Sequence, residues 1–169
     1  HDAVAAPLLA AEAWPLSVLV AITSTAQKSV GSTEGMERTR HTAPFYGSWL
    51  DSQAADLAEA RRAVAARDFE ALAAVAEHSC MKMHGLMLAA RPPLVYWNPT
   101  TLAALHEVIR LRGAGTPVFF TIDAGPQVKA VCLPEARERV QAVLTALPGV
   151  QQVLAAGLGQ GARLVEDPW

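Results

Sequence analysis

Residues 121–129 read Thr-Ile-Asp-Ala-Gly-Pro-Gln-Val-Lys, and this stretch decides how the second half of the chain folds. The apolar run 118–122 before the turn predicts a β-strand, and the apolar run 128–133 after it predicts a second one. The Ala-Gly-Pro turn at 124–126 joins the two strands into a hairpin, because proline fixes φ and glycine lets the backbone approach a ligand closely. The predicted hairpin therefore presents a single carboxylate, Asp123, at the mouth of a site.

A second segment whose residues could bind a ligand lies far upstream, where residues 28–36 read Lys-Ser-Val-Gly-Ser-Thr-Glu-Gly-Met. If a helix opens here, its first N–H groups point at an anion, Ser32 and Thr33 add hydroxyl donors, and Lys28 adds positive charge. The spacing is not that of a Walker loop. An ordinary helix cap is the alternative for this loop, and a turn-closing Asx hydrogen bond is the alternative for Asp123. Together the two segments favour an enzyme acting on a phosphorylated small molecule.

The composition fits a single domain, residues 1–169, and argues against two kinds of partner. Hydrophobic residues make up 51% of the chain, so it can bury a sizeable core. The net charge is −2 and Lys and Arg form no block, which argues against a nucleic-acid surface. No apolar run reaches the roughly 18 residues that a membrane-spanning helix needs. We therefore expect no nucleic acid and no membrane among the partners.

The two cysteines, Cys80 and Cys132, stand far apart inside apolar stretches, which predicts two buried thiols and no disulfide. Free thiols are typical of a reducing compartment, so we expect a cytoplasmic protein. The first residues, His-Asp-Ala-Val at 1–4, lack the charged start of a signal peptide. They also lack an initiator methionine, and we expect the chain to be part of a longer protein.

Hydrophobic periodicity predicts several helices beside a small sheet. Besides the hairpin, the predicted strands are 16–23, 150–154 and 162–165. Helices are predicted to begin near the capping residues Thr42, Asp68 and Asn98 and at Pro134. This order predicts an α+β fold, with a four-stranded antiparallel, ferredoxin-like sheet packed with helices.

The remaining polar and sulfur-bearing side chains have structural interpretations. Histidines on the predicted helices lack partners at metal-ligand spacing, so we predict no metal site. We expect His84 to be a hydrogen-bonded residue at a packing seam. Lys129 either reaches back toward the acid of the hairpin or stands alone on the surface. The predicted core methionines are Met81, Met83 and Met87.

Three motifs in chain order resemble the diphosphomevalonate decarboxylases of the GHMP kinase superfamily. Residues 28–36 are similar to the family's Lys-x-x-Ser-Ser-x-x-Gly-Met stretch. The Met-His pair at 83–84, followed by Pro-Pro and Tyr-Trp pairs within 92–97, resembles its next segment. Residues 119–129 are similar to its Phe-Thr-x-Asp-Ala-Gly-Pro-Asn-x-Lys signature, so the resemblance covers nearly the whole chain.

The resemblance implies a GHMP-kinase C-terminal-type domain, the C-terminal half of a two-domain carboxy-lyase. The family's N-terminal half carries the ATP loop and an arginine that meets the substrate carboxylate. The implied reaction converts mevalonate 5-diphosphate to isopentenyl diphosphate, CO₂, ADP and phosphate in the mevalonate pathway. ATP and Mg²⁺ are the implied cofactors and a homodimer is the expected assembly. We expect these 169 residues alone to be inactive.

The resemblance also assigns roles to individual residues. Asp123 matches the family's catalytic aspartate, which orients or deprotonates the 3-hydroxyl of the substrate during phosphoryl transfer. Ser32 matches the serine that holds the substrate diphosphate, and Lys28 and Thr33 stand close to it in the same loop. The turn that supports the aspartate consists of Ala124, Gly125 and Pro126.

Three positions depart from the family pattern. Gly31 stands where many members have serine, and Thr33 stands where some bacterial members have arginine. Gln127 replaces the asparagine that usually follows Pro126. These departures leave a mevalonate or mevalonate phosphate 3-kinase and a phosphomevalonate decarboxylase open as alternatives. A non-catalytic binding domain is a further alternative if the chain is complete.

Overall fold

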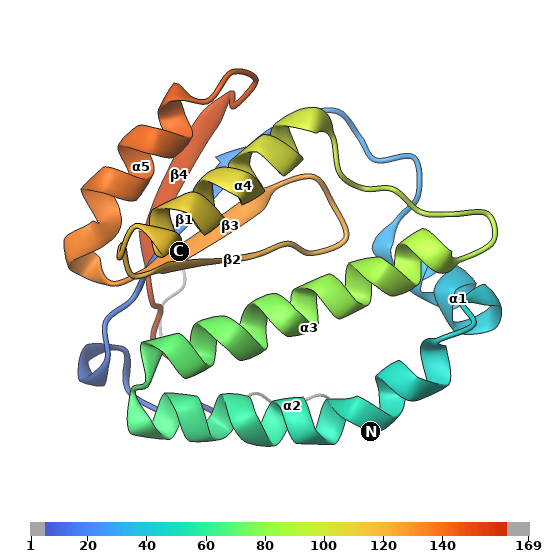
Figure 1. Ribbon diagram of the computed structural model, residues 1–169, viewed down its shortest axis with the longest axis horizontal. Coiled ribbons are helices and arrows are strands. Elements are labelled where there is room, and N and C mark those ends of the chain that lie inside the picture. The colour runs from blue at the N-terminus through green and yellow to red at the C-terminus, as the bar shows by residue number, and fades with distance from the viewer. Residues whose placement is uncertain (1–5, 162–169) are drawn as a thin grey trace, which may run out of the picture.

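The computed structural model describes residues 6–161. In chain order its elements are η1 (Ala11–Ala13), β1 (Ser17–Ile22), α1 (Ser32–Thr42), α2 (Tyr46–Ala66), α3 (Phe69–Ala89), α4 (Pro99–Gly113), β2 (Val118–Thr121), β3 (Val128–Cys132), η2 (Pro134–Ala136), α5 (Arg137–Ala146) and β4 (Gln152–Gly157). Within this range the strands form one antiparallel sheet of order β2-β3-β1-β4 (Figure 1). The predicted α+β fold with a four-stranded, ferredoxin-like sheet is confirmed.

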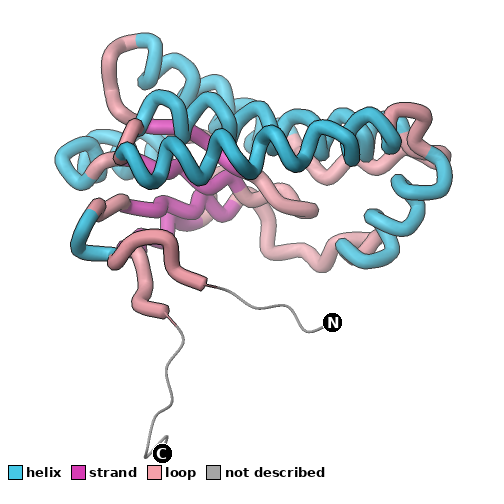
Figure 2. The backbone as a smooth tube through the Cα atoms, turned by 90° about the horizontal axis from the view of Figure 1, so that it is seen from below, coloured by secondary structure: helices cyan, strands magenta, loops and turns pink. Residues whose placement is uncertain are grey.

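One face of the sheet forms the core, because alternate residues of each strand point to the same side. Leu19 and Ala21 of β1 are fully buried, whereas Val18 and Val20 between them are half-buried. The helices α4 and α5 lie over the buried face, α3 runs along β2, and α2 packs outside α3 (Figure 1). Figure 2 shows the strands lying along one side of the layer of long helices.

Two predicted helix caps are confirmed and one prediction is wrong. The carboxylate of Asp68 accepts a hydrogen bond from the N–H of Ala71 at 3.0 Å, and Asn98 forms a capping box at the start of α4. Thr42, in contrast, ends α1 instead of starting the next helix. Its hydroxyl donates back to the carbonyl oxygen of Arg38 at 2.8 Å, and its oxygen accepts from the N–H of Arg91, also at 2.8 Å, instead of from a helix start. The next helix, α2, begins at Tyr46.

The remaining differences from the prediction are local. β4 begins at Gln152, two residues later than predicted, because the N–H of Val150 donates to the carbonyl of Leu147 in a turn, 3.1 Å away. The predicted strand at 162–165 lies outside the described residues. Met87 is buried in the core and Met83 is half-buried, but Met81 is 42% exposed, so its assignment to the core was wrong.

The predictions for the two cysteines and for His84 agree with the structure. Cys80 and Cys132 are free and buried, as predicted. His84 is only 3% exposed and lies against the indole of Trp97, with 4.7 Å between the ring centroids. Of the helices in residues 6–161, none has the combination of length and apolar character that a membrane-crossing segment requires.

Candidate functional site

The acid of the hairpin lies where β2 ends and the turn begins. Ile122, the residue before it, is 1% exposed, whereas the side chain of Asp123 is 79% exposed. Lys129 reaches the carboxylate from β3, with 2.5 Å between its Nζ and Oδ2 of Asp123. The pairing of Thr121 with Lys129 across the hairpin brings the lysine to this end of the sheet. The expectation that Lys129 can reach back to the acid is confirmed.

A pocket of about 430 Å³ opens beside this turn. Its lining includes Lys28, Asp123, Lys129 and the turn residues Ala124, Gly125 and Pro126. The ammonium of Lys28 donates to the carbonyl oxygen of Ala124 at 2.7 Å, although the two residues are 96 positions apart. The fold thus brings the lysine of the upstream loop to the acid-bearing turn. Two ammonium groups and one carboxylate give this pocket an excess of positive charge, which favours anionic ligands.

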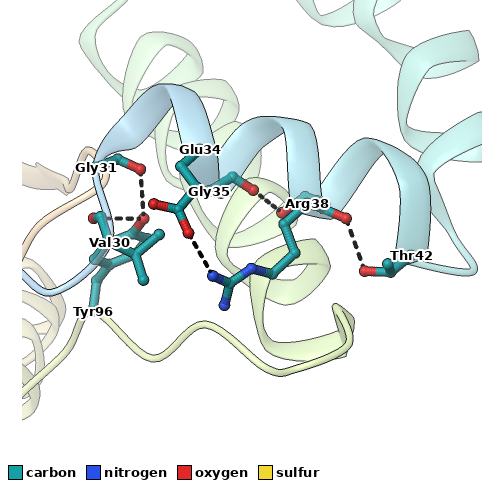
Figure 3. Close-up of polar contacts among 8 residues, drawn as sticks. Val30, Gly31, Glu34, Gly35, Arg38, Thr42 and Tyr96 are labelled. Carbon is teal, nitrogen blue, oxygen red and sulfur yellow. Dashed lines mark hydrogen bonds and ion pairs between the residues drawn. The ribbon is translucent and has the colours of Figure 1, made fainter.

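Ser32 and Thr33 lie in the first turn of α1 and are exposed. A helix does open at Ser32, with Gly31 as its N-cap. Neither hydroxyl residue is among those lining the pocket around Asp123. Glu34 shares the first turn, and Arg38 pairs with it at 2.8 Å (Figure 3).

Tyr96 ties the upstream loop to the start of α1 (Figure 3). Its hydroxyl oxygen lies 3.3 Å from the carbonyl oxygen of Val30 and 3.4 Å from that of Gly31. The hydroxyl also occupies the space next to Gly35, where a methyl group would collide with it. The Tyr-Trp pair of the sequence therefore has a visible function, since Tyr96 supports this loop and Trp97 packs on His84.

A polar network that sequence reasoning missed holds the far side of the turn. The carbonyl oxygen of Pro126 accepts hydrogen bonds from the hydroxyl of Thr23 at 2.9 Å and from that of Thr101 at 2.7 Å. The side-chain amide of Asn98 donates to Thr23, 3.2 Å from its carbonyl oxygen and 3.1 Å from its hydroxyl. The sequence showed the helix cap at Asn98, but it held no signal that this cap also supports the turn.

Gln127, which departs from the family pattern, belongs to the same network. Its side-chain oxygen accepts from the N–H of Thr23 at 2.6 Å, and its side-chain nitrogen donates to the carbonyl oxygen of Ser24 at 2.5 Å. The amide side chain thus bonds both a donor and an acceptor of the backbone that follows β1. Gln127 is therefore a structural anchor for the turn.

Comparison with known proteins agrees with this architecture. A family model described as "Mevalonate 5-diphosphate decarboxylase C-terminal domain" matches residues 18–160. This chain belongs to that family. Membership of this family confirms the GHMP-kinase C-terminal-type fold that the resemblance implied.

Known relatives are similar to this chain along most of its length. The diphosphomevalonate decarboxylase of Schizosaccharomyces pombe is 31% identical over 150 residues, which cover 86% of this chain and 38% of the relative. The solved mevalonate diphosphate decarboxylase from Staphylococcus aureus is 32% identical with a TM-score of 0.81, covering 89% of this chain and 46% of that one. A solved structure described as "MDDEF in complex with MVAPP, AMPPCP and Magnesium" is 35% identical with a TM-score of 0.80, covering 86% and 45%. The chain thus spans less than half the length of these relatives.

Within residues 6–161, no group of three or more His, Cys, Asp and Glu side chains is arranged to hold a metal ion. Among the described residues lining the pocket, Asp123 supplies the only carboxylate, and it is paired with Lys129. Mg²⁺ in nucleotide sites is bound through carboxylates together with phosphate oxygens and water. Asp123 is therefore the one carboxylate that the described lining of this pocket offers to such an ion.

Proposed function

We propose that this chain is the substrate-binding and catalytic-base half of an ATP-dependent diphosphomevalonate decarboxylase of the mevalonate pathway. The overall reaction would convert mevalonate 5-diphosphate and ATP to isopentenyl diphosphate, CO₂, ADP and phosphate. The observation that carries the proposal is the pocket in which Asp123 meets Lys28 and Lys129, in a chain of this family. ATP would supply the phosphoryl group that makes the 3-hydroxyl a leaving group.

Asp123 has the position and the chemistry for the catalytic base in this proposal. A tertiary alcohol is a poor nucleophile, and a carboxylate within hydrogen-bond reach can orient it and accept its proton. The side chain of Asp123 is exposed and can meet a substrate, whereas the buried Ile122 beside it fixes its backbone. Lys129 limits the directions that the carboxylate can take. General-base catalysis of this kind contributes about 10²–10⁴-fold.

The diphosphate would bind along the loop that leads from the pocket to α1. Lys28 lies at the pocket end of this loop, and Ser32 and Thr33 lie at the helix end. The free N–H groups in the first turn of α1 would donate to phosphate oxygens, and the helix dipole favours negative charge there. We assign Lys28, Ser32 and Thr33 to the diphosphate and Asp123 to the 3-hydroxyl.

The proposal also includes parts that lie outside this chain. An N-terminal half would hold ATP and Mg²⁺, in line with the AMPPCP and magnesium named for a solved relative. We further propose a cytoplasmic homodimer; two buried free thiols agree with a reducing compartment.

The test replaces the catalytic base in the full-length enzyme. Asp123→Ala should lower ATP- and substrate-dependent CO₂ release at least about 100-fold, because the general base is lost. Thermal stability should change little, since an exposed ion pair contributes about 0–1 kcal/mol. Asp51→Ala, at an exposed aspartate of α2, is the matched control and should keep full activity. Near-normal turnover of Asp123→Ala would remove this residue from the proposed role.

The same assay separates the alternative activities. ADP and CO₂ are followed together with the mono- and diphosphate substrates, and Ser32→Ala is measured beside the wild type. Release of ADP without CO₂ would indicate a 3-kinase, and a preference for the monophosphate would indicate a phosphomevalonate decarboxylase. In Ser32→Ala the Michaelis constant for the phosphorylated substrate should rise more than that for ATP.

A further inference from the structure

The strand that leads to Asp123 lies at an edge of the sheet. β2 pairs with β3 on one side, from Val118 to Thr121, and has no neighbouring strand on the other side among the described residues. Ile122 follows the last paired residue and is 1% exposed. Its N–H and C=O therefore lie beyond the strand pairing and are shielded from water. Buried backbone groups of this kind require other hydrogen-bond partners.

α3 supplies these partners with side chains instead of a strand. Glu77 accepts a hydrogen bond from the N–H of Phe120 at 3.2 Å. Cys80 accepts through Sγ from the N–H of Ile122, also at 3.2 Å. His84 donates from Nε2 to the carbonyl oxygen of Ile122 at 3.1 Å. The three side chains are spaced three and four residues apart, so they share one face of the helix.

The two contacts on Ile122 hold both polar groups of its backbone. A carbonyl oxygen can only accept, so Nε2 of His84 carries the proton in this contact. The imidazole is buried and rests on the ring of Trp97, which limits its rotation. Burial lowers the pKa of His84, so it donates as a neutral ring at pH 7. The Cys80 thiol lies 3.5 Å from the same carbonyl oxygen and can donate to it as well.

We propose that His84 and Cys80 are positioning residues that aim Asp123 by clamping the Ile122 backbone. The inference rests on the proposed catalytic role of Asp123. The other end of the turn is anchored at Pro126 by two threonine hydroxyls. Asp123 is therefore part of a three-residue span between two fixed backbone positions. Releasing one end would move the carboxylate, while Ser32 and Thr33 at the start of α1 keep their places.

The first experiment measures steady-state kinetics of the full-length enzyme. His84→Phe keeps a ring against Trp97 but removes the N–H donor. We expect kcat to fall about 10–100-fold, because misplacing a catalytic group by about 1 Å costs of that order. The Michaelis constant for mevalonate 5-diphosphate should stay within about threefold of the wild type. His84→Gln, whose amide can donate, should recover most of the loss, and His78→Phe at an exposed position of α3 should behave as wild type.

Two further measurements distinguish the clamp from the proposed function. Adding His84→Phe to Asp123→Ala should cause no additional loss of the residual rate, because the clamp acts through the aspartate. Exchange of the Ile122 amide hydrogen, followed by NMR in this chain, should become at least tenfold faster in Cys80→Ala. This exchange tests the clamp without any activity assay, and it replaces His84→Phe if that variant fails to fold.

Wild-type kcat in His84→Phe, beside an inactive Asp123→Ala, would overturn the clamp and leave the proposed function standing. An equal rise in the Michaelis constant, failure of His84→Gln to recover activity, or unchanged amide exchange in Cys80→Ala would also overturn it. An active Asp123→Ala with fast amide exchange in Cys80→Ala would instead refute the catalytic role of Asp123, while the contacts on the Ile122 backbone would stand.

Discussion

A neighbouring side chain leaves no room for a β-carbon at Gly35. The hydroxyl of Tyr96 occupies the position where a β-carbon would need space, while it contacts the loop carbonyls of Val30 and Gly31 (Figure 3). The next nearest atoms, Cζ of Tyr96 and Cδ1 of Leu94, are both 3.5 Å from that position and leave room for a methyl group. The conflict therefore depends on a single oxygen atom.

We predict that Gly35→Ala lowers the free energy of unfolding beside Tyr96 and raises it in a Tyr96→Phe background. Beside Tyr96, overpacking costs about 1–3 kcal/mol. Above its lower end, this cost exceeds the roughly 1 kcal/mol that alanine gains over glycine in a helix, so the free energy of unfolding should fall. In a Tyr96→Phe background the hydroxyl is gone, and the same substitution should stabilise by up to about 1 kcal/mol. Urea unfolding of the four chains measures this cycle, and an equal loss in both backgrounds would contradict it.

At the scale of elements, the start of α4 links a helix cap to the acid-bearing turn. The side-chain oxygen of Asn98 accepts from the N–H of Thr101 at 2.8 Å, and its amide nitrogen donates to Thr23. The hydroxyls of Thr23 and Thr101 then hold Pro126. Within the described residues, the side chain of Asp68 at the start of α3 makes only the capping bond, to the N–H of Ala71. The two helix starts therefore offer a matched comparison.

We predict that Asn98→Ala destabilises the chain more than Asp68→Ala. Losing the simple cap at α3 should cost about 1 kcal/mol. Losing the cap and the donors to Thr23 should cost about 2–3 kcal/mol, because buried partners remain unsatisfied. Asn98→Asp keeps the capping oxygen and loses the donors, so it should fall between wild type and Asn98→Ala. Chemical unfolding monitored by circular dichroism gives the three values, and equal costs at the two caps would refute this account.

The stability of the whole molecule should depend on one buried imidazole. Burial holds the pKa of His84 below its ordinary value of 6.5, although the nearby carboxylate of Asp123 partly opposes this. The unfolded chain therefore takes up a proton at a higher pH than the folded chain does. As the pH falls below 6.5, the unfolded state binds more protons and the free energy of unfolding decreases.

We predict a lower free energy of unfolding at pH 5 than at pH 7, and a smaller drop in His84→Gln. The glutamine cannot titrate, so its contribution to the pH dependence disappears. His78→Gln, on the exposed face of the same helix, should keep the wild-type drop. Urea titrations at both pH values provide the comparison; a drop of the same size in wild type and His84→Gln would show that another group is responsible.

Sequence patterns predicted the features that depend on neighbours along the chain. A short apolar run rich in β-branched residues marked β1, and the caps at Asp68 and Asn98 marked two helices within a residue of their start. The cap assigned to Thr42 was wrong because its hydroxyl bonds backward to Arg38, and its oxygen also accepts from the N–H of Arg91, 49 residues away. Such a partner has no trace in the local pattern.

By itself, the sequence determined the α+β class, the hairpin and the position of Asp123 at the end of its first strand, because each depends on periodicity and turn chemistry over a few residues. Only the tertiary structure decided what surrounds that acid. The packing of α3 against the edge of β2 brings His84 to Ile122, and the sheet order brings Lys28 to Ala124. Contacts between residues far apart in the chain follow from how whole elements pack, so no short stretch of sequence specifies them.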